Sequence, residues 1–191
     1  MSYVPRPYTL KLLNEVYRFK DDTGAEIVWT EGQIEIIDCI LHRSSPDGKT
    51  RIQTIASTRY GKSLAVAAGI VIRASTKPEK WAIVAGTKEK AQIIMDYVLM
   101  FSLNSSLVKS QLATNEPIDR LRQSRAKDRL MYRSKGEVRV FSAGSTQKSE
   151  TSKALMGFGC IPEGHTVMTD IGHIEIKDLV HSKRTNHVLS F

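Results

Sequence analysis

The chain has 191 residues, of which 41% are hydrophobic and 25% are charged, and its formal net charge is +8. This composition is typical of one ordinary soluble domain, with room for an appendage. The two cysteines, Cys39 and Cys160, cannot build a disulfide framework, which excludes a secreted disulfide scaffold and favours a cytoplasmic location. The longest apolar run, 64–72, is about half as long as a bilayer-spanning helix, so a membrane-spanning role is also excluded.

The charge is unevenly distributed along the chain. The surplus of lysine and arginine lies wholly within residues 1–159, whereas four of the five histidines follow residue 160. This shift in composition places a domain boundary near residue 160. A basic first part favours a polyanionic partner, although a solvated basic surface explains the same composition.

The first half of the chain shows helical periodicity interrupted by one β-rich segment. Apolar residues recur at helical spacing in 8–18 and in 34–41, which predicts two amphipathic helices. After a turn at 44–48, the residues of 51–56 favour a strand. The apolar run that follows, 64–72, predicts a buried helix.

The next segments continue the alternation of strands and helices. Residues 81–85 form a short apolar strand, and Thr87 is placed to cap a helix from about residue 88 to 101. Two later strands, 129–132 and 137–141, are predicted to form a hairpin. We therefore expect an α/β fold, in which helices cover a parallel sheet and ligands bind beyond the carboxyl ends of its strands.

A phosphate-binding loop is predicted between the strand at 51–56 and the helix at 64–72. The segment Ala56-Ser57-Thr58-Arg59-Tyr60-Gly61-Lys62-Ser63 fits the pattern G-x-x-x-x-G-K-[ST], except that Ala56 replaces the first glycine. In this position the backbone N–H groups and the helix N-terminus surround a phosphate, Lys62 adds a positive charge, and Ser63 offers a hydroxyl to Mg²⁺.

The arginine within this loop, in Thr58-Arg59-Tyr60-Gly61-Lys62-Ser63, gives a family resemblance. The loop resembles that of the ATPase of phage large terminase subunits, which pump DNA into capsids. Upstream, 29–33 is similar to the family's adenine-reading segment. Downstream, the resemblance covers the strand 81–86 with Thr87 after it, and 154–159, which is similar to the small-residue stretch just before the family's Walker B strand. The resemblance implies an incomplete P-loop NTPase (RecA-like) sheet.

The resemblance also implies roles for individual residues in binding ATP. Lys62 and Arg59 would contact the β and γ phosphates, Ser63 would bind Mg²⁺, and Gln33 would read adenine. The remaining loop residues would line the nucleotide: Ser57, Thr58, Tyr60 and Gly61.

The carboxylates that such an ATPase requires are missing from the expected place. A nucleoside triphosphatase of this class holds Mg²⁺ with an aspartate at the end of an apolar strand and orients water with a second carboxylate. Neither follows Gly159. Asp38 and Asp96 follow apolar residues, but both lie in segments of helical period and are predicted on helix surfaces. The chain is also too short for a terminase nuclease domain, so we expect it alone to hydrolyse ATP poorly or not at all.

A second resemblance begins where the Walker B strand is expected. The sequence there changes to Cys160-Ile161-Pro162-Glu163-Gly164-His165, followed by two strand-like stretches around a turn at 170–172. Taken by itself, this is a β-hairpin that begins with a thiol. It resembles the first block of an intein, with His165 where inteins commonly have threonine, which implies the start of a Hint-type fold in residues 160–191 and makes 1–159 the N-extein.

Cysteine suits the first step of protein splicing. A thiolate is a strong nucleophile that can attack the carbonyl of Gly159, the preceding residue, and exchange the peptide bond for a thioester without a cofactor. Because the chain ends at Phe191, the similarity is to the short N-terminal piece of an atypically split intein, a type associated with phage terminases. This implies a separately encoded C-intein that carries the C-terminal terminase fragment.

A basic segment at 119–135 is a candidate for contact with double-stranded DNA. Its arginines, among them Arg120, Arg122 and Arg125, are suited to phosphate contacts without sequence readout, and a solvated helix surface is an equally open interpretation.

Three functions remain open at this point. In the first, the chain is a trans-splicing precursor. Its joined product, with the portal, the small terminase subunit and further copies of itself, packages DNA in the cytoplasm of an infected bacterium. In the second, it is a truncated terminase interrupted by a contiguous intein. In the third, it is a stand-alone, helicase-like P-loop nucleotide-binding protein in which Cys160 is structural.

Overall fold

The computed structural model describes residues 5–44, 48, 52–113, 128–142, 166–169 and 172–175. The chain divides into two units, Met1–Gly144 and Ser145–Phe191. The boundary predicted near residue 160 lies outside the described residues and stays a prediction. Within the described part, every helix is too short or too polar to cross a bilayer.

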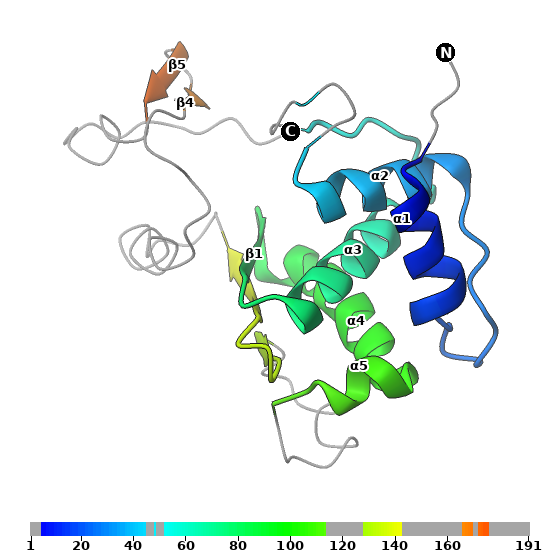
Figure 1. Cartoon of the computed structure of the whole chain (residues 1–191). Helices are drawn as coiled ribbons and strands as arrows, with labels where there is room; N and C mark the ends of the chain where they lie inside the picture. Colours follow the sequence, from blue (N-terminus) through cyan, green and yellow to red (C-terminus); the bar gives the residue numbers. More distant parts are fainter. Residues whose placement is uncertain are drawn as a thin grey trace. The chain divides into compact units, whose positions relative to one another are not determined.

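The first unit consists mainly of helices (Figure 1). The helices predicted at 8–18, 34–41, 64–72 and 88–101 are confirmed, with ends shifted by a few residues, and the first of them widens into a π-helical turn. As predicted, Thr87 caps its helix by accepting a hydrogen bond from the Lys90 N–H (3.4 Å). The helices are α1 (Pro7–Lys11), continued by the π-helical η1 (Leu12–Tyr17), then α2 (Glu31–His42), α3 (Lys62–Thr76), α4 (Lys88–Asn104) and α5 (Ser106–Ser110).

Helix α3 lies at the centre of this unit and packs against both α2 and α4. Most of its residues from Ala65 to Ser75 are buried. Gly69 allows α2 to approach closely, because a Cβ atom at this position would lie 2.8 Å from the Ile40 side chain. The predicted buried helix is thus the core of the unit, and its N-terminus carries the candidate phosphate-binding loop.

A small mixed sheet lies beside the helices, in the order β1-β3-β2. Strand β1 (Lys80–Ala85) runs parallel to β3 (Glu137–Ser142), with Trp81 opposite Val138, and β2 (Arg129–Met131) is antiparallel to β3. Helices α3 and α4 contact both β1 and β3. The predicted hairpin is therefore confirmed, and the first unit is of mixed α/β class, but the parallel partner of β1 is β3 and not the segment 51–56.

The strand predicted at 51–56 is not formed in the described residues. Residues 52–57 have no strand structure, and no described strand pairs with them. Ile55 is 88% exposed. A strand is stabilised by hydrogen bonds to a neighbour, so β-forming residues alone do not produce one. The prediction was wrong because residue propensity does not supply a pairing partner.

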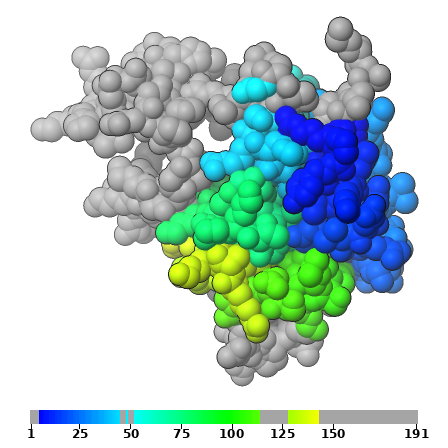
Figure 2. Space-filling view, viewed as in Figure 1, coloured from blue at the N-terminus to red at the C-terminus, as the bar shows by residue number. Residues whose placement is uncertain are grey.

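Asp38 is also placed differently from the prediction of a helix-surface aspartate. Its side chain is fully buried. Its helix, α2, packs against α1, whose atoms are dark blue in Figure 2. Thr9 Oγ1 donates to Asp38 Oδ1 (2.5 Å), Arg6 Nη1 lies 3.2 Å from Oδ2, and His42 Nε2 lies 3.6 Å from Oδ1. These contacts, made largely by residues far away in sequence, compensate the buried charge. Asp96 is exposed, as predicted.

The described part of the second unit is a hairpin. Strand β4 (Thr166–Thr169) pairs antiparallel with β5 (Gly172–Glu175), and Thr169 stands opposite Gly172. The two strands expected after Cys160 therefore pair as predicted, and the turn predicted between them, at 170–172, lies partly outside the described residues. The Hint-type fold to which it was assigned stays a prediction.

Candidate functional site

The segment from Ser57 to Gly61 makes a tight loop that leads directly into α3. The Tyr60 N–H donates to the Ser57 carbonyl (3.3 Å), which closes a turn. Arg59 (φ 65°) and Gly61 (φ 83°) both have left-handed backbone conformations. Such a conformation favours glycine, so Gly61 fits its position while Arg59 holds a costlier one. The loop thus places an arginine in a costly left-handed conformation and a glycine in one that it adopts readily, immediately before a helix N-terminus.

Lys62 is the first residue of α3, and its ammonium group reaches back across the loop. Its Nζ donates to the carbonyls of Ala56 (2.7 Å) and Ser57 (2.8 Å). The Ala65 N–H donates to the Gly61 carbonyl (3.0 Å), which begins the backbone hydrogen bonds of the helix. The N–H groups of the first turn, from Lys62 onward, have no partner within the helix and are available to an anion. An ammonium group, a set of backbone donors and the helix dipole therefore converge at one point.

The start of α2 contacts this loop directly. Gln33 Nε2 donates to the Tyr60 carbonyl (3.0 Å), and its Oε1 accepts from the Thr30 N–H (3.0 Å). Thr30 Oγ1 also donates to Tyr60 Oη across a long 3.4 Å. Gln33 is 8% exposed, so these bonds satisfy a buried amide.

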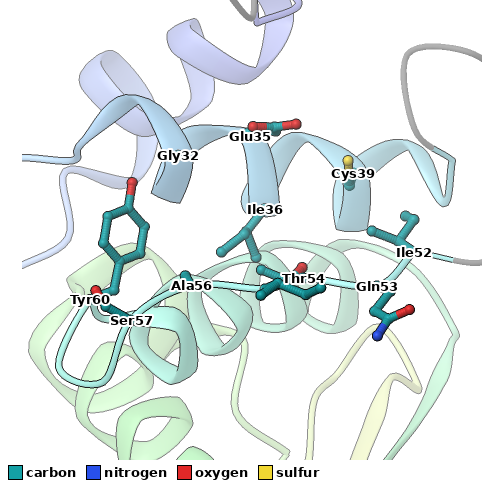
Figure 3. Close-up of a pocket in the computed structure, with 11 residues that line it drawn as sticks. Gly32, Glu35, Ile36, Cys39, Ile52, Gln53, Thr54, Ala56, Ser57 and Tyr60 are labelled. Carbon is teal, nitrogen blue, oxygen red and sulfur yellow. The ribbon is translucent and has the colours of Figure 1, made fainter.

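A cavity of about 430 Å³ lies between α2 and the segment 52–57 (Figure 3). The Tyr60 ring stands at one end of it, near Gly32, and Cys39 and Ile52 stand at the other. The cavity thus extends from the loop along one side of α2. Its walls are polar and apolar in part, with Glu35, Gln53 and Thr54 beside Ile36 and Ile55.

The structure brings the predicted nucleotide-binding residues together. Ser57, Thr58 and Arg59 are exposed on the loop, whereas Tyr60, Gly61, Lys62 and Ser63 are partly buried where it joins α3. Gln33 is far from them in sequence and reaches them through Tyr60. The other predicted site residues lie outside the described residues: Gly159, Cys160, Arg120, Arg122 and Arg125.

Two residues of this site, Thr30 and Gly32, were predicted only as part of the adenine-reading segment 29–33 and with no role of their own. A sequence signal for Thr30 exists, because Thr30-x-x-Gln33 has the spacing of a helix capping box. That pattern identifies the start of α2 but not its contact with the loop. Gly32 gives no signal until Tyr60 is seen against it.

Comparisons with protein-family models, with curated proteins and with solved structures find no match to this chain. Among the residues that the structure describes, no group of three or more histidine, cysteine, aspartate or glutamate side chains is arranged to hold a metal ion. Ser63, in the first turn of α3, is the predicted Mg²⁺ ligand. The loop and the sequence patterns are therefore the features of this chain that point to a function.

Proposed function

We propose that this chain is the N-terminal half of a phage DNA-packaging ATPase, the terminase large subunit, and that protein splicing at Cys160 joins it to its C-terminal half. The observation that carries the nucleotide-binding part is the loop from Ser57 to Lys62, which ends at the N-terminus of the buried helix α3. Lysine, backbone donors and a helix dipole at one place suit the phosphates of ATP.

The loop residues have distinct tasks in this proposal. The Lys62 ammonium leaves the Ala56 and Ser57 carbonyls and binds the β and γ phosphates, a stronger partner because it carries charge. Arg59, exposed on the loop, adds a second positive charge, and the Ser63 hydroxyl holds Mg²⁺. The ion supplies charge neutralisation on the phosphates when bound. A Walker B aspartate comes from the partner, so hydrolysis begins after joining.

The splicing part rests on the sequence at Gly159-Cys160 and on the hairpin β4–β5 that follows it. The Cys160 thiolate attacks the Gly159 carbonyl carbon and forms a C–S bond. The C–N bond between the two residues breaks, and the released amine of Cys160 takes up a proton. The product is a thioester. A nucleophile of the C-terminal half then attacks the Gly159 carbonyl carbon, the C–S bond breaks, and the Cys160 thiolate leaves with the intein piece. The polyanionic partner of the joined ATPase is double-stranded DNA.

Two measurements on the full chain test the two parts separately. Intact mass after treatment with dithiothreitol or hydroxylamine is compared with and without the candidate C-terminal partner. Cleavage after Gly159 or a joined product should appear in the wild type and neither in Cys160→Ala. An unchanged wild-type mass with the partner present would refute splicing chemistry at this cysteine. Calorimetric titration with MgATP should show binding without turnover, and binding together with rapid turnover would favour the stand-alone P-loop protein instead.

A further inference from the structure

The loop is attached to the start of α2 by hydrogen bonds at two levels. Gln33 holds the backbone of the loop through the Tyr60 carbonyl, and Thr30 reaches the outer end of the same residue through its phenol oxygen. Tyr60 lies between two left-handed residues, Arg59 and Gly61. The bonds from α2 therefore act next to Arg59, the loop residue that holds a costly backbone conformation.

The same residues are also closely packed. A Cβ atom at Gly32 would lie 2.3 Å from Tyr60 Oη and 3.1 Å from the ring carbon that bears it. A Cβ atom at Gly61 would lie 2.3 Å from Gln33 Nε2. Each glycine thus makes room for the side chain that crosses from the other segment. The five residues, Thr30, Gly32, Gln33, Tyr60 and Gly61, are called the Tyr60 clasp below.

The hydrogen bonds of Gln33 bear on how it acts. Its carbonyl oxygen accepts from the Thr30 N–H, and its amide nitrogen donates to the Tyr60 carbonyl, both at 3.0 Å. Moving this side chain toward a base would break both hydrogen bonds of a buried amide and leave its polar atoms without these partners. Holding the loop therefore uses both ends of the Gln33 amide.

We propose that Gln33 and Tyr60 are positioning residues. Through the Tyr60 clasp, they hold the phosphate-binding loop in its phosphate-accepting shape, whatever base the nucleotide carries. This inference rests on the proposed function and deepens it. In the described structure, Lys62 also braces the loop, but its ammonium must leave the loop carbonyls to bind phosphate. The clasp makes no use of that ammonium, so it persists when phosphate enters. The entropy of ordering the loop is then lost on folding and not on binding.

The test compares three ligands that share a phosphate chain and differ in the base: inorganic tripolyphosphate, ATP and GTP. Each is titrated with Mg²⁺ into the full chain by calorimetry. Gln33→Met removes both hydrogen bonds of the side-chain amide at nearly constant side-chain size and without adding charge. Gly32→Ala displaces the Tyr60 ring and leaves Gln33 in place, and alanine favours the helix more than glycine does. Gln111→Met, remote from the loop in sequence and next to α5, is the matched control.

Both clasp variants should lower the binding affinity for all three ligands by a similar factor, roughly fivefold or more. The control should bind each ligand as the wild type does. The urea midpoint of Gly32→Ala should not fall, which separates loop positioning from loss of structure. If Gln33→Met lowered the affinity for ATP and left the affinities for tripolyphosphate and GTP unchanged, the inference would be overturned, because Gln33 would then recognise the base. Unchanged binding of all ligands in both variants would overturn it as well. A wild-type chain that binds none of the three would refute the proposed nucleotide site itself, and the inference with it.

Discussion

Gly136→Ala should strongly destabilise the first unit. Gly136 ends the turn between β2 and β3, where the chain passes over the C-terminal end of α3. A Cβ atom there would lie 1.9 Å from the Ala74 carbonyl oxygen and 2.8 Å from the Lys77 carbonyl oxygen. Both are backbone atoms, so no side-chain rotation relieves the clash. Either the turn or the end of α3 has to move.

The cost follows from how far they must move. A carbon atom and a carbonyl oxygen ordinarily approach to about 3.3 Å, so the turn must shift by more than ~1 Å. Overpacking of this kind costs about 1–3 kcal/mol. The shift also breaks the hydrogen bond from Ser134 Oγ to the Ala74 carbonyl (2.7 Å), worth about 1 kcal/mol. We expect a loss of about 3 kcal/mol, a large share of the 5–15 kcal/mol of a typical domain.

Urea unfolding followed by far-ultraviolet circular dichroism measures this loss. With a slope of about 2 kcal/mol per molar, the midpoint should fall by about 1.5 M. Gly86→Ala is the matched control, because a Cβ atom at Gly86 would have no heavy atom within 4 Å, and its change should stay within about 0.5 kcal/mol. A Gly136→Ala midpoint as close to the wild type as that of the control would refute the packing argument.

Lys62→Ala should weaken MgATP binding at least about tenfold in calorimetry, because a charged partner of the phosphates is lost. Lys11→Ala, on an exposed helix face, is the control and should bind as the wild type does. Equal affinities of the two variants would contradict the proposed site. Asp38→Ala should lower the unfolding free energy by about 3 kcal/mol in urea, since it leaves the buried partners of that carboxylate unpaired. Burial and the charge of Arg6 hold the pKa of His42 below its ordinary 6.5, so the unfolded chain binds a proton that the folded chain does not. Stability should therefore fall as the pH drops from about 7.5 to 5.5, and an equal fall in His42→Gln would assign the effect elsewhere.

The helices were predictable because their signals are local. The apolar spacing of 34–41 and the cap at Thr87 depend on residues within one or two turns, and the structure confirms both. Asp38 shows the limit of such signals. Its position on a helix could be predicted from the neighbouring residues. Its burial could not, because it depends on Arg6 and Thr9, which contact Asp38 through the packing of α1 on α2.

The sheet and the site show the same limit. The hairpin of β2 and β3 could be predicted, since its strands are close in sequence. The β-forming residues of 51–56 predicted a strand, but the described structure has none there. In the site, the spacing of 56–63 located the loop and the helix that follows it. The contact of Tyr60 with α2 could not be predicted. It joins segments that are far apart in the sequence, and no local pattern shows that they meet in the fold.

The position of Trp29 gives the chain an optical reporter beside its candidate site. Its indole packs against the rings of Phe19 (centroids 6.3 Å apart) and Phe101 (6.1 Å), and the next residue is Thr30 of the Tyr60 clasp. A shift of the α2 start relative to the loop moves the indole across these two rings and alters its emission. With Trp81 replaced by phenylalanine, an intrinsic fluorescence of Trp29 that stays constant as nucleotide binds would show, without an added label, that the start of α2 keeps its place beside the loop.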